Sequence, residues 1–307
     1  MLKNGVNRFS IGGVELNDPS LACQGRKHSA AEMIALLDYL RSLNPRPQIA
    51  TDMMIGVPHQ TLETLYNTLA TLIKKEVDCV MTFPLMFKVA QPNWQAYLKN
   101  PGSFPSVKER AEMAALAMLT FQEAGYTHAP MHYFNRSEQA MHQQQLNKFE
   151  TLDETGLLGI GVSAFGFVNG YQYYNTCAIE DYNKAIENSE PPTWKALKLS
   201  RRQLFEREVM FRLFSRGVDK RKITEKYGYR IDEEYAAIIE KLQSAGLLES
   251  TTEHLKLTDL GILFAEEVCD KFAGEDVRKK ANEKALTTSP TDPLQTYNYN
   301  KIGHRLR

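Results

Sequence analysis

Apolar positions in the first half of the chain alternate between short continuous runs and helical spacing. Short runs occupy residues 5–12, Ile49–Ile55 and Val77–Phe83. Between them, apolar residues recur every three or four positions after Ser29 and after Thr61. The runs predict buried strands and the periodic segments predict helices. Strands that alternate with helices of this length predict right-handed βαβ units and a parallel sheet, with functional groups at the carboxyl ends of the strands.

Polar residues mark the starts of the expected helices. Ser29 and Glu32 have the spacing of a capping box, and Ser106 and Glu109 repeat that spacing before another helical pattern. Tyr126–His132, which follows that helix, is expected to be a fourth strand. The first half of the chain is therefore expected to fold as an α/β domain.

The pattern changes in the second half. Leu157–Phe167 is apolar and glycine-rich, and Asn169-Gly170 directly after it predicts a hairpin turn. Glu190-Pro191-Pro192 marks a boundary. From about Trp194 the pattern indicates helix packed on helix, and Arg202–Phe214 is expected to be a long amphipathic helix.

Shorter elements follow. Two more helices are expected at Lys222–Tyr227 and Asp232–Ala245, then a small β-wing over 246–258 and a last helix at Leu260–Phe272. Three helices with a wing predict a winged-helix-like arrangement. After Gly274 the chain is charged and polar, which is typical of a flexible tail.

Composition narrows the class of protein. The 307 residues carry a formal net charge of +0, so no overall field attracts nucleic acid or an anionic membrane. Hydrophobic residues make up 43% and charged residues 24%, as in ordinary globular proteins. No apolar run approaches the roughly 18 residues of a membrane span, and no signal-peptide core is evident. A cytoplasmic protein is expected.

The cysteines give no sign of a metal site. Cys23, Cys79, Cys177 and Cys269 lie far apart in the sequence. Zinc and iron–sulfur loops usually use closely spaced pairs of cysteines. We expect four reduced and mostly buried thiols, and no metal ligands.

Several segments follow one another in the order of a known family. They are Gly5-Val-Asn-Arg-Phe-Ser-Ile-Gly12, Gly25-Arg-Lys-His28, Asp52-Met-Met-Ile-Gly-Val-Pro58 with Gln60-Thr61, Leu157-Leu-Gly-Ile-Gly-Val-Ser-Ala164, Ala245-Gly-Leu-Leu-Glu249 and Leu255-Lys-Leu-Thr-Asp-Leu-Gly261. Over about residues 4–272, they resemble the radical-SAM family of oxygen-independent coproporphyrinogen III oxidases. Haem chaperones and anaerobic haem-degrading methyltransferases are relatives within it. The segment at 157–164 favours the oxidases.

The resemblance implies a fold and a set of domains. Residues 5–12 resemble the family's fourth barrel strand, which lies in the middle of that barrel. The strand is expected to form an exposed sheet edge that needs a partner, such as a separate N-terminal half or an upstream segment. The expected fold is a partial radical-SAM (β/α) TIM-like barrel and a helical, winged-helix-like domain. The expected domains are residues 1–190 for the barrel and its extension, 191–273 for the helical domain and 274–307 for the tail.

The resemblance also assigns cofactor-binding residues. Asp52, expected at its strand's end, matches an S-adenosyl-L-methionine (SAM) contact, and Arg26 matches the contact to the SAM carboxylate. Val162 matches an apolar position beside a second SAM, and Asn147 falls where the family has a glutamine near that site. The simpler alternatives are an aspartate that caps the next turn and a surface arginine.

The end of the opening strand departs from the family. Where the family has a SAM-contacting glutamine, this chain has Val14, or Glu15 if the alignment slips by one residue. Neither side chain is an amide. The SAM site is therefore expected to differ from the family's.

The family's chemistry needs a group that these residues do not evidently hold. The family binds a [4Fe–4S] cluster through C-x-x-x-C-x-x-C, cleaves SAM to a radical and oxidatively decarboxylates propionates of coproporphyrinogen III to vinyl groups. That motif does not occur in the 307 residues. We expect the enzymatic activity to be impaired or incomplete and reconstitution with iron and sulfide to give no cluster absorbance. The catalytic residues are not identified.

Two other functions stay open. The first is a non-catalytic fragment or a relative that binds haem or another tetrapyrrole. The second is a winged-helix nucleic-acid binder, suggested by Arg216 and Lys220-Arg-Lys222. Because Asp232-Glu-Glu234 begins the would-be recognition helix, a domain that covers the barrel is favoured and no nucleic-acid partner is expected.

One histidine is a candidate substrate contact. His128 and His132 are four residues apart on the expected fourth strand, so they should share one face. His132 is expected at the strand end, where it could face a tetrapyrrole or bind haem iron. The alternative is a hydrogen-bonded or partly exposed histidine without such a role.

Overall fold

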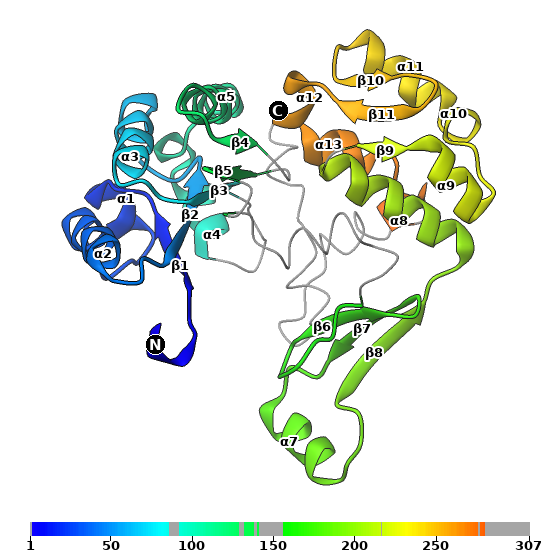
Figure 1. Ribbon diagram of the computed structural model, residues 1–307, viewed down its shortest axis with the longest axis horizontal. Coiled ribbons are helices and arrows are strands. Elements are labelled where there is room, and N and C mark those ends of the chain that lie inside the picture. The colour runs from blue at the N-terminus through cyan, green and yellow to red at the C-terminus, as the bar shows by residue number, and fades with distance from the viewer. Residues whose placement is uncertain are drawn as a thin grey trace. The chain divides into compact units, whose positions relative to one another are not determined.

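The computed structural model describes residues 2–85, 92–128, 132–137, 140, 156–215, 217–275 and 277–279. The chain forms two compact units, one up to His142 and one over Gln143–Asn300. Figure 1 shows the elements of each unit. Asn147, most of the polar tail and Arg216 lie outside the described residues.

The first unit is built on a five-stranded sheet in the order β1-β2-β3-β5-β4. The strands β1, β2 and β3 are parallel, as expected, but β5 is antiparallel to both β3 and β4. The expectation of one strand at 126–132 is wrong, because the described residues of that stretch form the short β4 and residues 133–135 form a separate strand, β5, antiparallel to it. The strands are β1 (Arg8–Val14), β2 (Gln48–Ile55), β3 (Cys79–Pro84), β4 (Thr127–His128) and β5 (Tyr133–Asn135).

The helices α2, α3 and α5 cover one side of these strands (Figure 1). The capping boxes at Ser29 and Ser106 are confirmed, and Thr61 with Thr64 forms a third. They lie at the starts of α2, α3 and α5, which satisfies otherwise unpaired backbone N–H groups. The helical elements are η1 (Leu2–Asn4), α1 (Asp18–Cys23), α2 (Ala30–Ser42), α3 (Leu62–Lys74), α4 (Pro92–Lys99), η2 (Pro101–Ser103) and α5 (Val107–Glu123).

The core of the first unit lies between sheet and helices. Alternate residues of β2 point toward the helices and are at most 4% exposed: Ile49, Thr51, Met53 and Ile55. The helices contribute buried side chains such as Leu65, Leu69, Leu72 and Phe121. Each such apolar side chain contributes about 1.5–3 kcal/mol of burial free energy.

The strand β1 forms one edge of the sheet, as expected, and contains a bulge. Its Ile11 pairs with Thr51 and its Val14 with Met53, so β1 has one more residue than β2 between these pairs. A Cβ atom on Gly13 would lie 2.6 Å from the Thr51 Oγ1 atom, and this close approach requires glycine. Among the described strands, the sheet does not close into a barrel.

The second unit begins with a three-stranded antiparallel sheet, β6 (Phe165–Val168), β7 (Tyr171–Asn175) and β8 (Thr193–Lys198). The predicted hairpin turn is confirmed, since Asn169 and Gly170 both have positive φ, 51° and 78°. The helix α7 (Ile179–Glu187) connects β7 to β8. The expectation of helical packing from Trp194 is wrong, because residues 193–198 pair with β7 and satisfy its free edge.

The rest of the second unit contains the expected helices and wing. The predicted helices at 232–245 and 260–272 are each divided in two, at Tyr235 and Phe264. The wing strands form a sheet in the order β10-β11-β9. The elements are α8 (Arg201–Phe214), β9 (Val218–Asp219), α9 (Lys220–Tyr227), α10 (Ile231–Glu234), α11 (Ala236–Ser244), β10 (Leu248–Ser250), β11 (His254–Leu257), α12 (Asp259–Leu263) and α13 (Ala265–Asp270).

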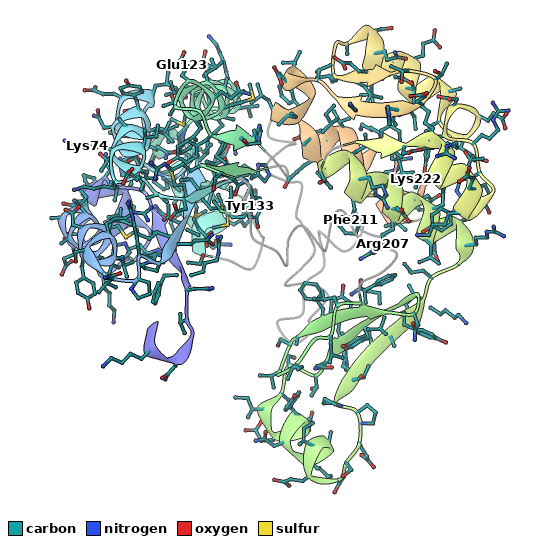
Figure 2. All side chains as sticks on the ribbon, in the orientation of Figure 1. Lys74, Glu123, Tyr133, Arg207, Phe211 and Lys222 are labelled. Carbon is teal, nitrogen blue, oxygen red and sulfur yellow. The ribbon has the colours of Figure 1, made fainter. Side chains whose placement is uncertain are left out.

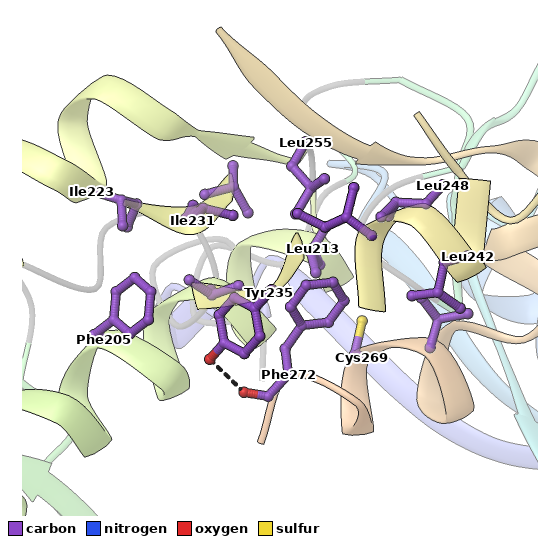
Figure 3. Packing of buried hydrophobic residues seen from close by; sticks show 14 of the residues in the cluster. Phe205, Leu213, Ile223, Ile231, Tyr235, Leu242, Leu248, Leu255, Cys269 and Phe272 are labelled. Carbon is purple, nitrogen blue, oxygen red and sulfur yellow. Dashed lines mark hydrogen bonds between the residues drawn. The ribbon is translucent and has the colours of Figure 1, made fainter. Parts of the chain in front are cut away.

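A continuous apolar cluster joins these helices to the wing (Figure 3). At its centre Phe205 stacks on Tyr235, whose ring meets that of Phe272 edge to face. The Tyr235 hydroxyl donates a hydrogen bond to the Phe272 carbonyl oxygen at 2.9 Å. Over the part of the chain that the structure describes, no helix combines the length and the apolar character needed to span a membrane.

Candidate functional site

The face of the first sheet that points away from the helices carries the candidate site. We call it the inner face and define it by Ala50, Asp52, Cys79, Met81 and Tyr133. Strand pairing places Asp52 beside Met81, and Met81 beside Tyr133, in one row across β2, β3 and β5. Ala50, Cys79, Met81 and Tyr133 form a buried apolar cluster. The carboxylate of Asp52 is therefore a polar group on a mainly apolar surface.

Asp52 lies within β2 rather than at its end. The strand continues to Ile55, so the expected strand-end position is wrong. The Asp52 side chain is half-buried, and this burial raises the pKa of its carboxyl, while the positive charge of Arg26 offsets part of the effect. A partly desolvated carboxylate with one nearby cation retains acceptor capacity for a ligand.

Arg26 lies in the turn after α1, and its positive charge acts on this carboxylate. Gly25 has φ of +67°, a left-handed conformation that ends the helix, and the Arg26 N–H donates to the Leu21 carbonyl oxygen at 3.0 Å. The position that a Cβ atom would take on Gly12 is 3.7 Å from Arg26 Nη1. The guanidinium thus lies over Gly12 of β1, within electrostatic reach of Asp52. The structure brings these two predicted residues together.

Glu15 does not join them. Its N–H donates to the Gly13 carbonyl oxygen at 2.6 Å, which turns the chain after β1. The carboxyl is 1% exposed, and burial raises its pKa, an effect only partly offset by the side chains of Ser20, Thr64 and Gln60. Neither oxygen accepts a hydrogen bond of ordinary geometry from a described residue.

Because Ser20 and Thr64 belong to α1 and α3, Glu15 points between helices rather than toward Asp52. The side chain of Val14 is not among those described. Of the two residues that could replace the family's glutamine, Glu15 is therefore not on the inner face.

Val162 belongs to the second unit. It is 40% exposed and lies in the glycine-rich segment before β6. The Asn175 Nδ2 atom donates to the Gly159 and Gly161 carbonyl oxygens at 3.2 and 3.0 Å, and the Tyr182 hydroxyl accepts from the Gly161 N–H at 3.0 Å. These bonds hold the segment in a defined shape that presents Val162 to solvent. Asn147, its predicted neighbour, cannot be placed beside it because it is outside the described residues.

The two histidines do not share a strand face, so that expectation is wrong. His128 is in β4 and stacks on Phe134 at 4.3 Å between ring centroids, and Phe134 stacks on Phe121 of α5. His132 precedes β5, and its ring meets the edge of Phe83 at 5.8 Å. Phe83 packs against the inner-face cluster. His132 is therefore the histidine on the inner-face side, and its substrate role stays a prediction.

The cysteines are not gathered. Cys79 and Cys269 are buried, whereas Cys23 and Cys177 are exposed, so the expectation of mostly buried thiols holds for two of the four. Among the described residues, no group of three His, Cys, Asp or Glu side chains could hold a metal ion. These residues do not fit an iron–sulfur cluster.

Two further polar residues near the inner face were not predicted. Arg8 of β1 donates from Nη1 to the Ala140 carbonyl oxygen at 2.9 Å and lies near Cys79. Tyr133, labelled in Figure 2, belongs to β5. Burial raises the pKa of its phenol, with smaller contributions from Cys79 and Asp52. Arg8 could have been found from the sequence, because an arginine within an apolar strand is unusual. Tyr133 could not, because its position depends on the unexpected strand β5.

The basic stretch Lys220-Arg-Lys222 and the acidic stretch Asp232-Glu-Glu234 are joined by one ion pair. Lys220 is 6% exposed, and its Nζ atom donates to Asp232 Oδ1 at 2.6 Å, to Ser250 Oγ at 2.8 Å and to the Thr251 carbonyl oxygen at 2.6 Å. Lys220 and Asp232 come from the basic and the acidic stretch singled out in the sequence. Lys220 is therefore occupied within the fold.

Comparisons with known proteins agree with this architecture. Residues 199–264 match the family model described as HemN C-terminal domain. The chain is 23% identical over 272 residues to heme chaperone HemW of Bacillus subtilis, covering 88% of this chain and 70% of that protein. It is 23% identical over 285 residues to oxygen-independent coproporphyrinogen III oxidase of Salmonella typhimurium, covering 87% of this chain and 61% of that protein.

A solved structure shares the fold. It is coproporphyrinogen III oxidase (HemN) from Escherichia coli, described as a radical SAM enzyme, with a TM-score of 0.74 and 21% identity. The match covers 89% of this chain and 65% of that one. The chain thus spans between 61% and 70% of the length of these three proteins.

Proposed function

Because the chain is a relative of the radical-SAM coproporphyrinogen III oxidases and haem chaperones, we propose that it binds SAM and a tetrapyrrole. The activity it most resembles is oxygen-independent oxidative decarboxylation of coproporphyrinogen III propionates to vinyl groups. The observation that carries the proposal is that the Arg26 guanidinium lies over Gly12, where its positive charge acts on the Asp52 carboxyl of the inner face.

The charges of this site suit the amino-acid part of SAM. A guanidinium binds a carboxylate through paired N–H donors, so Arg26 would hold the SAM carboxylate. Asp52 would accept hydrogen bonds from the SAM amino group or the ribose hydroxyls. When bound, SAM supplies this family with the group for radical chemistry. The protein's contribution is to bind and orient it beside the inner face.

The tetrapyrrole would lie on the apolar part of the same face. Met81, Phe83 and Tyr133 provide apolar and aromatic contacts, and His132 packs beside Phe83. The Tyr133 phenol is protonated at neutral pH, and burial raises its pKa further, so its hydroxyl can donate a hydrogen bond. Candidate substrate contacts and cofactor contacts therefore belong to adjacent strands of one sheet.

The proposal is tested by calorimetric titration of SAM into the full chain. We expect saturable binding that Asp52→Asn weakens about tenfold, the usual cost of a charged hydrogen-bond partner. Asp38→Asn is the matched control, because Asp38 is an exposed carboxylate in a surface pair with Lys75. Equal SAM affinity in wild type and Asp52→Asn would overturn the assignment of Asp52.

A second candidate is a haem-binding relative without oxidase activity. It is favoured by the similarity to a protein named heme chaperone, of which the chain spans 70%. Absorbance and fluorescence titrations with haem and coproporphyrin III separate the two. The oxidase-like proposal predicts tighter binding of coproporphyrin III, whereas preference for haem would support the chaperone-like alternative.

A further inference from the structure

One carboxyl group of the first unit is buried without a hydrogen-bond partner. Glu15 follows β1 and is 1% exposed, and neither of its oxygens accepts a hydrogen bond of ordinary geometry from a described residue. The side chains that face it are Ser20 in α1, Gln60 after β2 and Thr64 in α3. All three are neutral, and no charged side chain of a described residue is among them. The ionised form of a carboxyl group is costly in such surroundings.

The polar hydrogens of the facing side chains are already engaged. Each side chain donates to a backbone carbonyl oxygen: Ser20 Oγ to Pro58 at 2.9 Å, Gln60 Nε2 to Met54 at 3.0 Å and Thr64 Oγ1 to Thr61 at 3.2 Å. A hydroxyl oxygen keeps lone pairs after its own proton is donated, so the Ser20 oxygen can accept from the O–H group of a neutral carboxylic acid. The neutral form of Glu15 is therefore the form that suits the site, in agreement with its raised pKa.

The helix α1 has few contacts with the rest of the unit besides this one. Of its six residues, only Ser20 and Leu21 are buried. Glu15 lies against Ser20, one of these two. The position of α1 therefore depends on the apolar contact of Leu21, on the hydrogen bond from Ser20 to Pro58 and on the charge of Glu15.

The same helix positions Arg26. The Arg26 N–H donates to the Leu21 carbonyl oxygen at 3.0 Å, and the turn at Gly25 places the guanidinium over Gly12. An ionised Glu15 would put an uncompensated negative charge against α1. Because displacing this short helix exposes only two buried residues, it is an inexpensive way to admit water to the charge. Arg26 would move with the helix.

We infer that Glu15 is a positioning residue: its neutral form holds α1 so that Arg26 lies over Gly12, and its ionisation releases both. The inference rests on the proposed function, because Arg26 is the residue assigned there to the SAM carboxylate. Each unit by which the pKa of Glu15 is higher in the docked arrangement than in the displaced one makes the displaced one about tenfold more populated at high pH. SAM affinity should fall accordingly.

The test is calorimetric titration of SAM into wild type and Glu15→Gln between about pH 5 and about pH 8. The ratio of the two affinities isolates Glu15, because Asp52 and the SAM amino group titrate alike in both proteins. We expect equal affinities at the acid end and about tenfold tighter binding by Glu15→Gln at the alkaline end. Glu63→Gln is the matched control and should follow wild type, because Glu63 is exposed in the first turn of α3.

Hydrogen–deuterium exchange without SAM measures the release of α1 directly. The two proteins are compared at the same pH, so that the intrinsic pH dependence of exchange cancels. Relative to Glu15→Gln, wild type should exchange the amides of α1 and Arg26 faster as pH rises, whereas the amides of α5 should exchange equally in both. Circular dichroism at each pH establishes that a difference in exchange or binding is not a loss of folding.

The two measurements separate the inference from the proposed function. If wild type and Glu15→Gln have parallel SAM affinities and parallel exchange across the range, the inference is overturned while the proposed function stands. If exchange of α1 differs but the affinity ratio does not, the assignment of Glu15 to the SAM site is overturned. If wild type binds no SAM at any pH, the proposed function fails, and the exchange of α1 alone decides whether Glu15 positions Arg26.

Discussion

Buried charges are compensated in the helical part of the second unit but not on the inner face of the first. In the helical part, Glu208 receives three donors and Lys220 binds Asp232 together with two oxygen acceptors. On the inner face, the half-buried Asp52 is influenced by the single cation Arg26, and burial outweighs it.

This difference in the number of protein partners distinguishes charges that stabilise the fold from charges that can bind a ligand. A buried ion is costly unless hydrogen bonds and opposite charges surround it. Where the protein supplies these partners, the charge stabilises the native arrangement. Where it does not, a ligand can supply them. This contrast supports assigning Asp52 to binding, and Glu208 and Lys220 to stability.

The largest effect is expected from breaking the compensated cluster. Glu208→Ala should lower the free energy of unfolding by about 3 kcal/mol, because it leaves Arg212, Lys226 and the Tyr227 hydroxyl without their shared acceptor. Glu225→Ala, which breaks an exposed pair with Arg221, should cost less than about 1 kcal/mol. Urea unfolding followed by circular dichroism measures both, and equal losses would refute the contrast.

A smaller effect should separate the two stacked arginines of α8. Arg202→Met should lower the free energy of unfolding by about 1 kcal/mol, because Glu206 and Glu234 lose a partner. Arg207→Met should stay within about 0.5 kcal/mol of wild type, since methionine keeps contact with the two aromatic rings beside it and no carboxylate is left unpaired. A loss at Arg207 as large as that at Arg202 would show that Arg207 serves the fold.

The smallest effect concerns Glu15 and depends on pH. Burial raises the folded-state pKa of Glu15 above 4.5, so protonation favours the folded state. This contribution is fully present below the unfolded pKa and is lost as pH rises through the folded pKa, by about 1.4 kcal/mol for each unit of difference.

The free energy of unfolding of Glu15→Gln should therefore equal that of wild type near pH 4 and increasingly exceed it as pH rises to 8. Thermal unfolding across this range measures the difference. The exposed Glu123→Gln is the control and should run parallel to wild type. A Glu15→Gln curve that also runs parallel would mean that the carboxyl does not titrate differently in the folded state.

Local features of the fold were predictable from the sequence. The capping boxes at Ser29 and Ser106 and the hairpin at Asn169-Gly170 depend on residues within four positions of one another, and all are confirmed. The strands β5 and β8 were missed because their pairing depends on distant partners. Tyr133 pairs with Met81 and Lys195 with Tyr174, and no local pattern records those contacts.

The same limit applies to the site. Arg26 and Asp52 were named from a resemblance, and their proximity required the bulged strand β1 and the left-handed turn at Gly25. Glu15 was named only as a replacement for the family's glutamine, because its burial between α1 and α3 depends on distant residues such as Thr64. An uncompensated charge can be recognised only when the neighbours of every charge are known.

The central claim is that Asp52 on the inner face of the first unit binds SAM. The most direct measurement is calorimetric titration of SAM into wild type, Asp52→Asn and the control Asp38→Asn. We predict that Asp52→Asn loses about tenfold in SAM affinity and that Asp38→Asn keeps the wild-type affinity. If Asp52→Asn binds SAM as tightly as wild type, the claim is contradicted.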